Sequence, residues 1–580
     1  MNSALWKTCI GGFATAVFCA ATCVTSFGAE AKSLEDMEKE LNSLKATISG
    51  LTEQMELVKQ EKAVAAASDT KEDVAALKSE VSTLKEEMRV AAEGAPAMKA
   101  EDIAGNVYSE FAKKVKLGGQ VRTRAEYANG FYQGVANNGT LNGANTSVAA
   151  TGGVRSRVNA VDDSYVLNQT RLWADADVNE HLRVFIQFQD ARTFGSEGST
   201  VGYASSGGGA ANGSGGGENS MIDLHQGYFD LRKLFDMPLT VRVGRQEIVW
   251  GDHRVLGNFV WSNVGRVFDA GRFMWDTDTI HAEAFAAKVD EDGFFVGSEG
   301  AGTANPGNGS SDENVYAAQL AFKKLVPSAL LELMYICKSD QDDTAGAGTT
   351  LSGTGNAALA GSVTNIHDFG ARIDGKVPNL DAMDYTLESH VQVGTYGTAA
   401  QEAWAFAGKT GYTLKNVAWT PRFGIEYDYA SGDSDTTDGT HETFDNLYPT
   451  NHWQGIYGFA DLVSWQNMHD FRGQVKVSPT KKLTAQVDYH YFLLAEESDG
   501  WYLANATLAA PRANKAGVGT SYDTSDDELA QEFDLTVSYD LYKNVKILAG
   551  YSYFAAGDWI ENNIGDTDTN WAYLQTTVTF

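Results

Sequence analysis

The chain contains 580 residues, with 59 Gly, only nine Pro, 11% aromatic residues and a formal net charge of −31. After the N-terminal leader, no apolar run reaches the roughly 20 residues that a membrane-spanning helix needs, so a helical membrane protein is excluded. The mean hydropathy is slightly negative, as expected of a membrane-spanning β-barrel, in which only alternate residues of each strand face lipid.

Residues 1–31 have the features of a secretory signal peptide. Lys7 provides the positive charge, residues 9–25 the apolar stretch, and residues 29–31 a small-x-small cleavage site. The alternatives are a membrane anchor and a lipoprotein signal at Cys23, but the residues before Cys23 fit a lipidation site poorly. The leader therefore predicts export across the inner membrane.

Residues 32–92 form a second predicted module, a periplasmic coiled coil. Apolar residues recur there at spacings of three and four, which is the a/d pattern of heptads. The first run is Leu34, Met37, Leu41, Leu44, Ile48, Leu51, Met55 and Val58, and the second is Val74, Leu77, Val81, Leu84 and Met88. The second run is in a shifted register. Two interpretations are open: a parallel homo-oligomer, with a homotrimer as the expected state, and a helical hairpin that folds back at the break near Asp69.

Residues 93–114 are the expected linker, and residues 115–580 the expected outer-membrane β-barrel. Period-2 alternation is clearest from Phe533 to Tyr539, where every second residue is apolar, so one face of the strand suits lipid and the other a polar lumen. The fold class is therefore all-β transmembrane, an antiparallel barrel of about 18 strands preceded by an α-helical coiled coil; 16 or 20 strands are the alternatives. The candidate strands are 115–127, 164–178, 182–194, 222–232, 239–248, 267–275, 279–289, 313–323, 329–338, 365–375, 383–395, 403–414, 420–430, 469–477, 482–494, 529–539, 545–556 and 570–580.

The connections between these strands alternate in length. Short turns are expected at 179–181, 326–328, 478–480 and 541–544. Long polar loops are expected at 128–163, 196–221, 290–311, 339–363, 431–468 and 495–527. Short turns of such barrels face the periplasm and long loops face the exterior, which places both termini in the periplasm. A soluble β-sandwich or propeller has no reason to sort its connections in this way.

Basic residues alternate with apolar neighbours on many strands and are predicted to point into the lumen. This substrate-path set is Arg122, Arg124, Arg171, Arg183, Arg242, Arg372, Arg422, Arg472 and Lys476. A guanidinium binds a carboxylate through two parallel hydrogen bonds and stays charged, so a row of arginines could pass an organic anion from site to site. The alternative is that the arginines pair with lumenal acids and stiffen the wall, because Asp175, Asp374, Glu388, Glu426, Asp428, Asp488, Glu532 and Asp534 are also predicted to point inward.

The segment 251–266 joins two strands on the external side yet is rich in apolar residues, among them Phe259 and Trp261. A solvated loop has no use for these residues, so we expect the segment to fold inward and narrow the pore. Arg254, Trp261 and Arg266 would then lie at the constriction. The alternative is that the segment packs against neighbouring loops as a lid.

Three segments resemble the alginate export family of outer-membrane barrels: VRVGRQEIVWGDHRVLGNFVWSNVGRVFDAGRF at 241–273, and the segments 424–468 and 528–560. They occur in the order that the family shows. The resemblance implies an 18-stranded barrel that passes a secreted anionic polysaccharide outward as a passive conduit. The coiled coil is not part of that family's barrel.

An enzyme is the alternative from a different class, since barrels can carry hydrolase sites built on Ser–His pairs. His390 and His490 are predicted to face inward, but no G-x-S-x-G motif accompanies a serine. We therefore expect no catalytic residues, and neither a metal site nor a cofactor. Cys337 is the single cysteine left after the leader is removed, so no intramolecular disulfide is expected.

The expected partners are outer-membrane lipids and lipopolysaccharide, further copies of the chain in a homotrimer, and the cell wall through the coiled coil. No nucleic acid is expected. Acidic external loops hold much of the negative charge and could bridge lipopolysaccharide through divalent cations. The segment GDSDTTDG at 432–439 is faintly like a calcium loop, but it lacks the terminal Glu, so solvated loop charge is the preferred interpretation.

Overall fold

The computed structural model describes residues 113–132, 140–141, 144–145, 160–194, 219–290, 313–340, 363–435, 438–450, 452–504, 508–510, 524–563 and 566–580. The chain divides into two units, residues 1–105 and 106–580. The predicted signal peptide and coiled coil lie outside the described residues, as does nearly all of the linker. The fold described below is that of the second unit.

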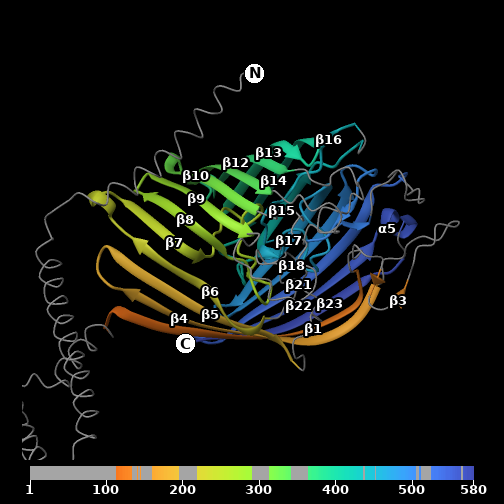
Figure 1. Ribbon diagram of the computed structural model, residues 1–580. Coiled ribbons are helices and arrows are strands. Elements are labelled where there is room, and N and C mark those ends of the chain that lie inside the picture. The colour runs from red at the N-terminus through yellow and green to blue at the C-terminus, as the bar shows by residue number, and fades with distance from the viewer. Residues whose placement is uncertain are drawn as a thin grey trace, which may run out of the picture. The chain divides into compact units, whose positions relative to one another are not determined.

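This unit is a closed antiparallel barrel (Figure 1), formed by 18 of the 19 strands in the main sheet of the described residues. The barrel strands are β1 (Val115–Tyr132), β4 (Ala160–Asp177), β5 (Leu182–Thr193), β6 (Asn219–Leu231), β7 (Leu239–Gln246), β8 (Phe268–Asp276), β9 (Ile280–Asp290), β10 (Glu313–Val326), β11 (Ala329–Asp340), β12 (Thr364–Lys376), β13 (Met383–Tyr396), β14 (Ala399–Thr413), β15 (Arg422–Ala430), β17 (Met468–Thr480), β18 (Leu483–Leu494), β21 (Glu528–Tyr542), β22 (Val545–Ala556) and β23 (Thr569–Thr579). The last strand pairs with the first, from Gln120 opposite Thr579 to Asn129 opposite Asn570, which closes the wall.

Short elements occupy the connections. They are β2 (Thr140–Leu141), β3 (Ala144–Asn145), β16 (Thr440–His441), β19 (Trp501–Tyr502), β20 (Leu508–Ala510), η2 (Leu234–Asp236), η5 (Trp453–Gly455) and α5 (Asp558–Asn563). β16 is the nineteenth strand of the main sheet and pairs in parallel with the start of β14. None of the helices in the described part of the chain is long and apolar enough to cross a membrane.

The prediction of an antiparallel barrel of about 18 strands is confirmed. Each predicted strand overlaps one barrel strand, and 545–556 coincides with β22. The largest differences are at the strand ends next to the longer connections, where β1 continues to Tyr132 and β14 already begins at Ala399. The connection between β13 and β14 consists only of residues 397 and 398, with Gly397 at a positive φ of 61°. The end of the barrel with the longer loops therefore has one tight turn among them.

The two faces of the wall differ as the alternation predicts. On β15, Ile425 is 67% exposed on the outward face, whereas Glu426 and Asp428 are buried on the lumenal face. Outward apolar side chains suit lipid, whereas lumenal polar groups form ion pairs with one another, such as that of Arg472 with Glu426 and Asp488. Most of the buried apolar cluster lies among inward-folded loops and the strand ends around them. Its largest members include Trp250, Trp465 and Trp501.

A charge placed on the outward face of β15 tests this assignment. We expect Ile425→Arg to destabilise the folded barrel by about 2–4 kcal/mol, because the guanidinium would face hydrocarbon. The measurement is reversible urea unfolding in phospholipid vesicles, with Ile425→Leu as the matched control that changes stability little. Equal stability of the Arg and Leu variants, or a circular dichroism spectrum dominated by helix, would contradict the lipid-facing assignment.

Candidate functional site

The connection between β7 and β8, residues 247–267 (the inner loop), lies inside the barrel. At one end of its span it contacts β1 and β4, and at the other it contacts β12, β14 and β15. Only a segment within the lumen can touch strands from such different parts of the wall. The inner loop therefore crosses the lumen and stands in the path of any molecule that passes through.

Three predicted arginines fasten the inner loop to the wall formed by β1 and β4. Arg122 donates hydrogen bonds to the carbonyl oxygens of Val260 and Ser262, both at 2.8 Å. Arg124 donates to the carbonyl oxygen of Trp261 at 2.8 Å, and its guanidinium lies 3.8 Å from the centre of the Trp261 ring. The loop thus uses arginines of the wall as fixed donors for its main chain.

Arg171 of β4 extends this attachment through side chains as well as the main chain. It donates to the carbonyl oxygen of Val264 at 3.4 Å and forms an ion pair with Glu247 at 3.2 Å. Glu247 also contacts His225 at 2.8 Å. The predicted lumenal position of Arg122, Arg124 and Arg171 agrees with these contacts, but all three are buried under the inner loop and do not line an open surface.

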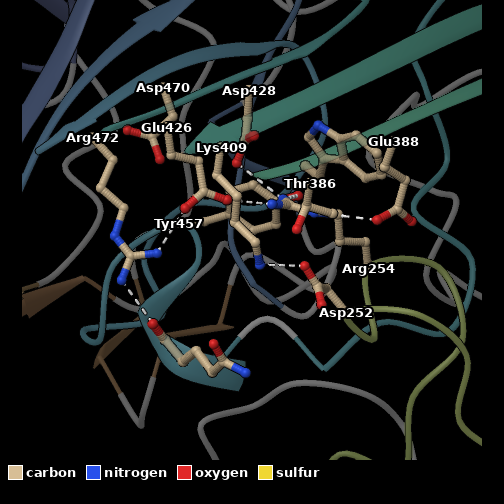
Figure 2. Close-up of polar contacts among 12 residues, drawn as sticks. Asp252, Arg254, Thr386, Glu388, Lys409, Glu426, Asp428, Tyr457, Asp470 and Arg472 are labelled. Atoms are coloured by element: carbon tan, nitrogen blue, oxygen red, sulfur yellow. Dashed lines mark hydrogen bonds and ion pairs between the residues drawn. The ribbon is translucent and has the colours of Figure 1, made fainter. Parts of the chain in front are cut away.

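On the opposite wall, Arg254 at the tip of the inner loop reaches a group of acids (Figure 2). Its guanidinium is 2% exposed and forms ion pairs with Asp428 at 2.9 Å, with Glu426, and with Glu388 at 3.7 Å. It also contacts the hydroxyl of Tyr457 from another loop. A buried arginine surrounded by several carboxylates is an anchor, because removing it would leave buried charges without a partner.

Asp252, two residues before Arg254, makes a second attachment. Its carboxylate pairs with Arg372 of β12 at 2.9 Å and with Lys409 of β14. Burial alone would raise the pKa of Asp252, but the charges of Lys409 and Arg372 outweigh it and lower the pKa to about 2. The pKa of an Asp in an unfolded chain is about 3.9. The stabilisation from this attachment is therefore fully present above that pH and is lost as the pH falls through 2.

The described part of a second connection, residues 431–435, 438–450 and 452–467, folds inward with the inner loop. Tyr448 exchanges main-chain hydrogen bonds with it: the Tyr448 amide donates to the Val255 carbonyl at 3.0 Å, and the Gly257 amide donates to the Tyr448 carbonyl at 2.7 Å. A Cβ at Gly257 would lie 2.1 Å from the Thr450 hydroxyl oxygen, so only glycine allows this approach. The inner loop thus both folds inward and packs on a neighbouring loop.

The prediction of a long polar loop at 431–468 is wrong in its polarity, because most of the described part of this loop is buried. The sequence did contain a signal, because this loop has a run of apolar and aromatic residues like that of 251–266. The structure buries these residues. The run includes Phe444, Leu447, Tyr448, Ile456, Tyr457, Leu462, Val463 and Trp465. A polar external loop would not contain such a run, so the same argument applied to 444–465 would have found it.

Arg266, at the far end of the inner loop, donates to the carbonyl oxygens of Pro449 at 2.7 Å and Gly257 at 3.4 Å. Burial lowers the pKa of Arg266 to about 10, so the guanidinium is charged at neutral pH. Trp261 stacks on His452 with ring centres 3.8 Å apart. All three predicted constriction residues are therefore buried within the contact between the two loops and the wall.

The other predicted basic residues, apart from Lys476, pair with acids on the wall. Arg183 pairs with Asp175 and Asp230, Arg242 with Asp230, Arg372 with Glu332, Arg422 with Asp384, and Arg472 with Glu426 and Asp488. Lys476 is exposed. The structure thus brings most of the set next to carboxylates, as the interpretation of a stiffened wall requires.

The two histidines that the sequence predicted to face the lumen contact carboxylates. His390 lies 2.7 Å from Asp368, and His490 lies 2.8 Å from Asp470. No hydrogen bond joins either ring to a serine hydroxyl within the described ranges. Across the same ranges, no group of three His, Cys, Asp or Glu side chains is arranged to hold a metal ion.

Comparison with known proteins gives one family match. The family model described as alginate export matches residues 151–573. A search of curated proteins finds no match. Among solved structures, the chain is similar to the outer membrane protein OprD from Pseudomonas aeruginosa (10% identity, TM-score 0.46, covering 80% of this chain and 93% of that chain). It is also similar to Pseudomonas aeruginosa OpdQ (12%, 0.47, 81% and 99%) and to Acinetobacter baumannii OccAB1 (14%, 0.45, 80% and 97%).

The anchor at Arg254 can be tested by single-channel recording. We expect Arg254→Met to detach the tip of the inner loop, because it leaves Glu426, Asp428 and Glu388 without this buried cation, at a cost of about 3–5 kcal/mol. The current should become larger and noisier than that of the wild type. The control is Arg242→Met, which removes a lumenal arginine that does not hold the loop and leaves Asp230 paired with Arg183. Identical currents for Arg254→Met and the wild type would show that Arg254 does not fix the loop.

Proposed function

The chain belongs to the alginate export family, and from this premise we propose that it is a passive outer-membrane channel for anionic saccharides or small organic anions. Family membership and the 18-stranded barrel make it an outer-membrane channel and not an enzyme. The proposal concerns the chemistry of what passes. It rests on the charges that stand beside the inner loop.

The observation that carries the proposal is that two arginines at the inner loop form no ion pair with a carboxylate of the residues that the structure describes. Arg122 and Arg266 donate to main-chain carbonyls, and within the described residues no carboxylate oxygen lies within 4.0 Å of either guanidinium. A carbonyl satisfies the donors of a guanidinium without cancelling its charge. The field of these two cations therefore extends into the lumen beside the inner loop.

Such a field favours anions where the path is narrow. Low-dielectric walls focus the potential of fixed charges, and salt screens it over about 8 Å at physiological ionic strength. Neither arginine is exposed enough to hold a substrate tightly, which suits passage, because a conducting site must release what it attracts. Uronates and other carboxylated solutes are the class that this arrangement favours.

A general diffusion porin is the second candidate, and a specific observation favours it. The wall formed by β15, β17, β18 and β21 is acidic: Asp428, Asp470, Asp488, Glu532 and Asp534 are all buried on its lumenal face. If these acids outweigh the arginines at the inner loop, the pore will show little selectivity or will prefer cations.

We also propose that residues 32–92 form a periplasmic coiled coil that joins copies of the chain, a homotrimer being the state expected from the sequence. The heptad pattern supports this proposal. The same segment could contact the cell wall. Lipopolysaccharide around the barrel and divalent cations at its acidic loops complete the proposed surroundings.

Selectivity can be measured as the reversal potential of the channel in a planar bilayer under a salt gradient. We expect the wild type to prefer chloride or a small uronate over potassium. Arg122→Gln combined with Arg266→Gln should shift the preference towards cations, because two positive charges that form no ion pair are removed. The matched control is the corresponding double Lys variant, which keeps both charges while losing the planar fork. Preference for cations in the wild type would reject the anion channel and leave the general porin.

The coiled coil has its own test. We expect deletion of residues 33–90 to lower the mass of the detergent-solubilised protein from a trimer to a monomer in light scattering, because the a/d seam would be gone. The conductance of each barrel should be unchanged. A full-length protein that is already monomeric would refute self-association through this segment.

A further inference from the structure

Three aromatic side chains lie on the lumenal face of the neighbouring strands β4, β5 and β6. They are Trp173, Phe185 and Tyr228, and we call them the aromatic platform. Trp173 lies two residues after Arg171 on the same face of β4, and Phe185 lies four residues before Gln189 on the same face of β5. Both Arg171 and Gln189 contact the inner loop. Tyr228 lies opposite Phe185 in the register, so all three aromatic residues face the lumen.

The aromatic platform lies between the inner loop and the end of the barrel that has the short turns. Trp173 is four residues before the last residue of β4, and Phe185 is three residues after the first residue of β5. The short connection 178–181 joins these two strands. Arg171 and Gln189, which contact the inner loop, are further from this connection on the same strands. A solute that enters from this end therefore meets the platform before it reaches the inner loop.

The rings of the platform are close to the wall and to one another. Trp173 lies opposite Gly118 of β1, and a Cβ at Gly118 would come within 2.6 Å of three indole atoms, so glycine lets the ring lie against the main chain. The rings of Phe185 and Tyr228 stack with their centres 5.3 Å apart. Trp173 pairs with Gln187, which makes Phe185 its diagonal neighbour, at a spacing of roughly 7–8 Å that aromatic side chains can bridge. Trp173 and Phe185 are half-buried, so solvent in the lumen still reaches both.

The charged side chains beside the platform are paired with one another. Arg183 binds Asp175 through hydrogen bonds of 2.7 and 3.0 Å and forms an ion pair with Asp230 at 3.2 Å. Arg242 binds Asp230 at 2.6 and 3.1 Å, and its guanidinium lies 3.9 Å from the centre of the Tyr228 ring. Two arginines and two aspartates leave this part of the wall without net charge. Within the described residues, Nη1 of Arg242 donates no hydrogen bond, so a donor is left for a solute.

We propose that the aromatic platform is a binding site for the rings of a saccharide, whether or not those rings carry a carboxylate. A pyranose ring has faces of C–H groups, which stack on aromatic rings, and a rim of hydroxyl groups, which need polar partners. Trp173 and Phe185 provide the aromatic surface, and Asp175 and Arg242 provide an acceptor and a donor beside it. The inference rests on the proposed function only in taking the lumen as the path of a solute. It goes beyond the preference for anions, because stacking of this kind requires no charge.

The pairing of the arginines favours a saccharide over an aromatic acid. An aromatic carboxylate also stacks on aromatic rings, but its charge needs a cation that no acid of the protein already neutralises. Beside the platform, Arg183 and Arg242 both bind aspartates. An uncharged ring with hydroxyl groups loses nothing from this pairing, since an ion pair still offers donors and acceptors to a hydroxyl.

Blocking of the single-channel current by cellohexaose, a neutral chain of glucose rings, tests the site. With the sugar in both compartments of a planar bilayer, we expect the full-length wild type to show brief interruptions of its current. Trp173→Ala combined with Phe185→Ala should shorten the mean duration of these interruptions by about tenfold, because two stacking surfaces are lost. Trp173→Tyr combined with Phe185→Tyr should restore most of the duration, because both aromatic faces return.

The matched control is Trp275→Ala combined with Phe188→Ala, which removes one Trp and one Phe from the outward face of β8 and β5. We expect interruptions as long as those of the wild type. The different gel mobility of heated and unheated samples reports that the barrel of each variant is folded. Equal shortening by the two Ala pairs would overturn the proposal, because the effect would then come from a disturbed wall and not from the lumenal rings.

Three further results would overturn the site: a wild type that cellohexaose does not block, blocks of unchanged duration in the Trp173→Ala, Phe185→Ala variant, and blocking by benzoate or a mannuronate hexamer but not by cellohexaose. The last result would show that charge, and not the ring surface, holds the solute. The preference for anions is judged separately by the reversal potential. A wild type that prefers cations yet is blocked by cellohexaose would reject the anion channel and support the saccharide site.

Discussion

The pairing of every wall-forming backbone group is the constraint on which the rest of this structure depends. Hydrocarbon offers no hydrogen-bond partners, so a spanning sheet must close on itself. Here β23 pairs with β1, and the C-terminal Phe580 still exchanges main-chain hydrogen bonds with Gly119. Closure sends one set of alternate residues outward and the other inward. A polar lumen follows directly, since apolar residues are needed on the lipid face.

Two inward-folded loops occupy the polar lumen that closure creates. Their main-chain carbonyls need donors, and the lumenal arginines provide them. At the Arg122 wall, guanidinium groups hold the inner loop by its backbone; at the opposite wall, Arg254 of the loop is held by Glu426 and Asp428. The inner loop is thus fixed at both ends by attachments of opposite polarity, which gives the lumen a basic and an acidic side.

The strands were predictable because alternation is a local property, and consecutive strands of such a barrel are neighbours. The interior of the barrel was less predictable. The inward fold of the inner loop followed from its apolar residues, but its contacts join positions far apart in sequence: 172 residues separate Arg254 from Glu426. Nothing local marks Asp428 as the partner of Arg254 rather than of Arg472. Partner choice depends on which strands closure brings face to face, and the single sequence does not contain that information.

The same contacts show that the effect on a passing ion does not follow from the number of lumenal arginines alone. An arginine paired with a carboxylate, such as Arg422 with Asp384, adds structure but little net field. An arginine that binds carbonyls, such as Arg122 or Arg266, forms hydrogen bonds without an ion pair, so no carboxylate in contact with it cancels its charge. Selectivity in this lumen should therefore depend on the few arginines that hold the inner loop rather than on the total basic content. The proposed preference for anions would therefore depend on side chains that also hold the inner loop, as Arg122 and Arg266 do.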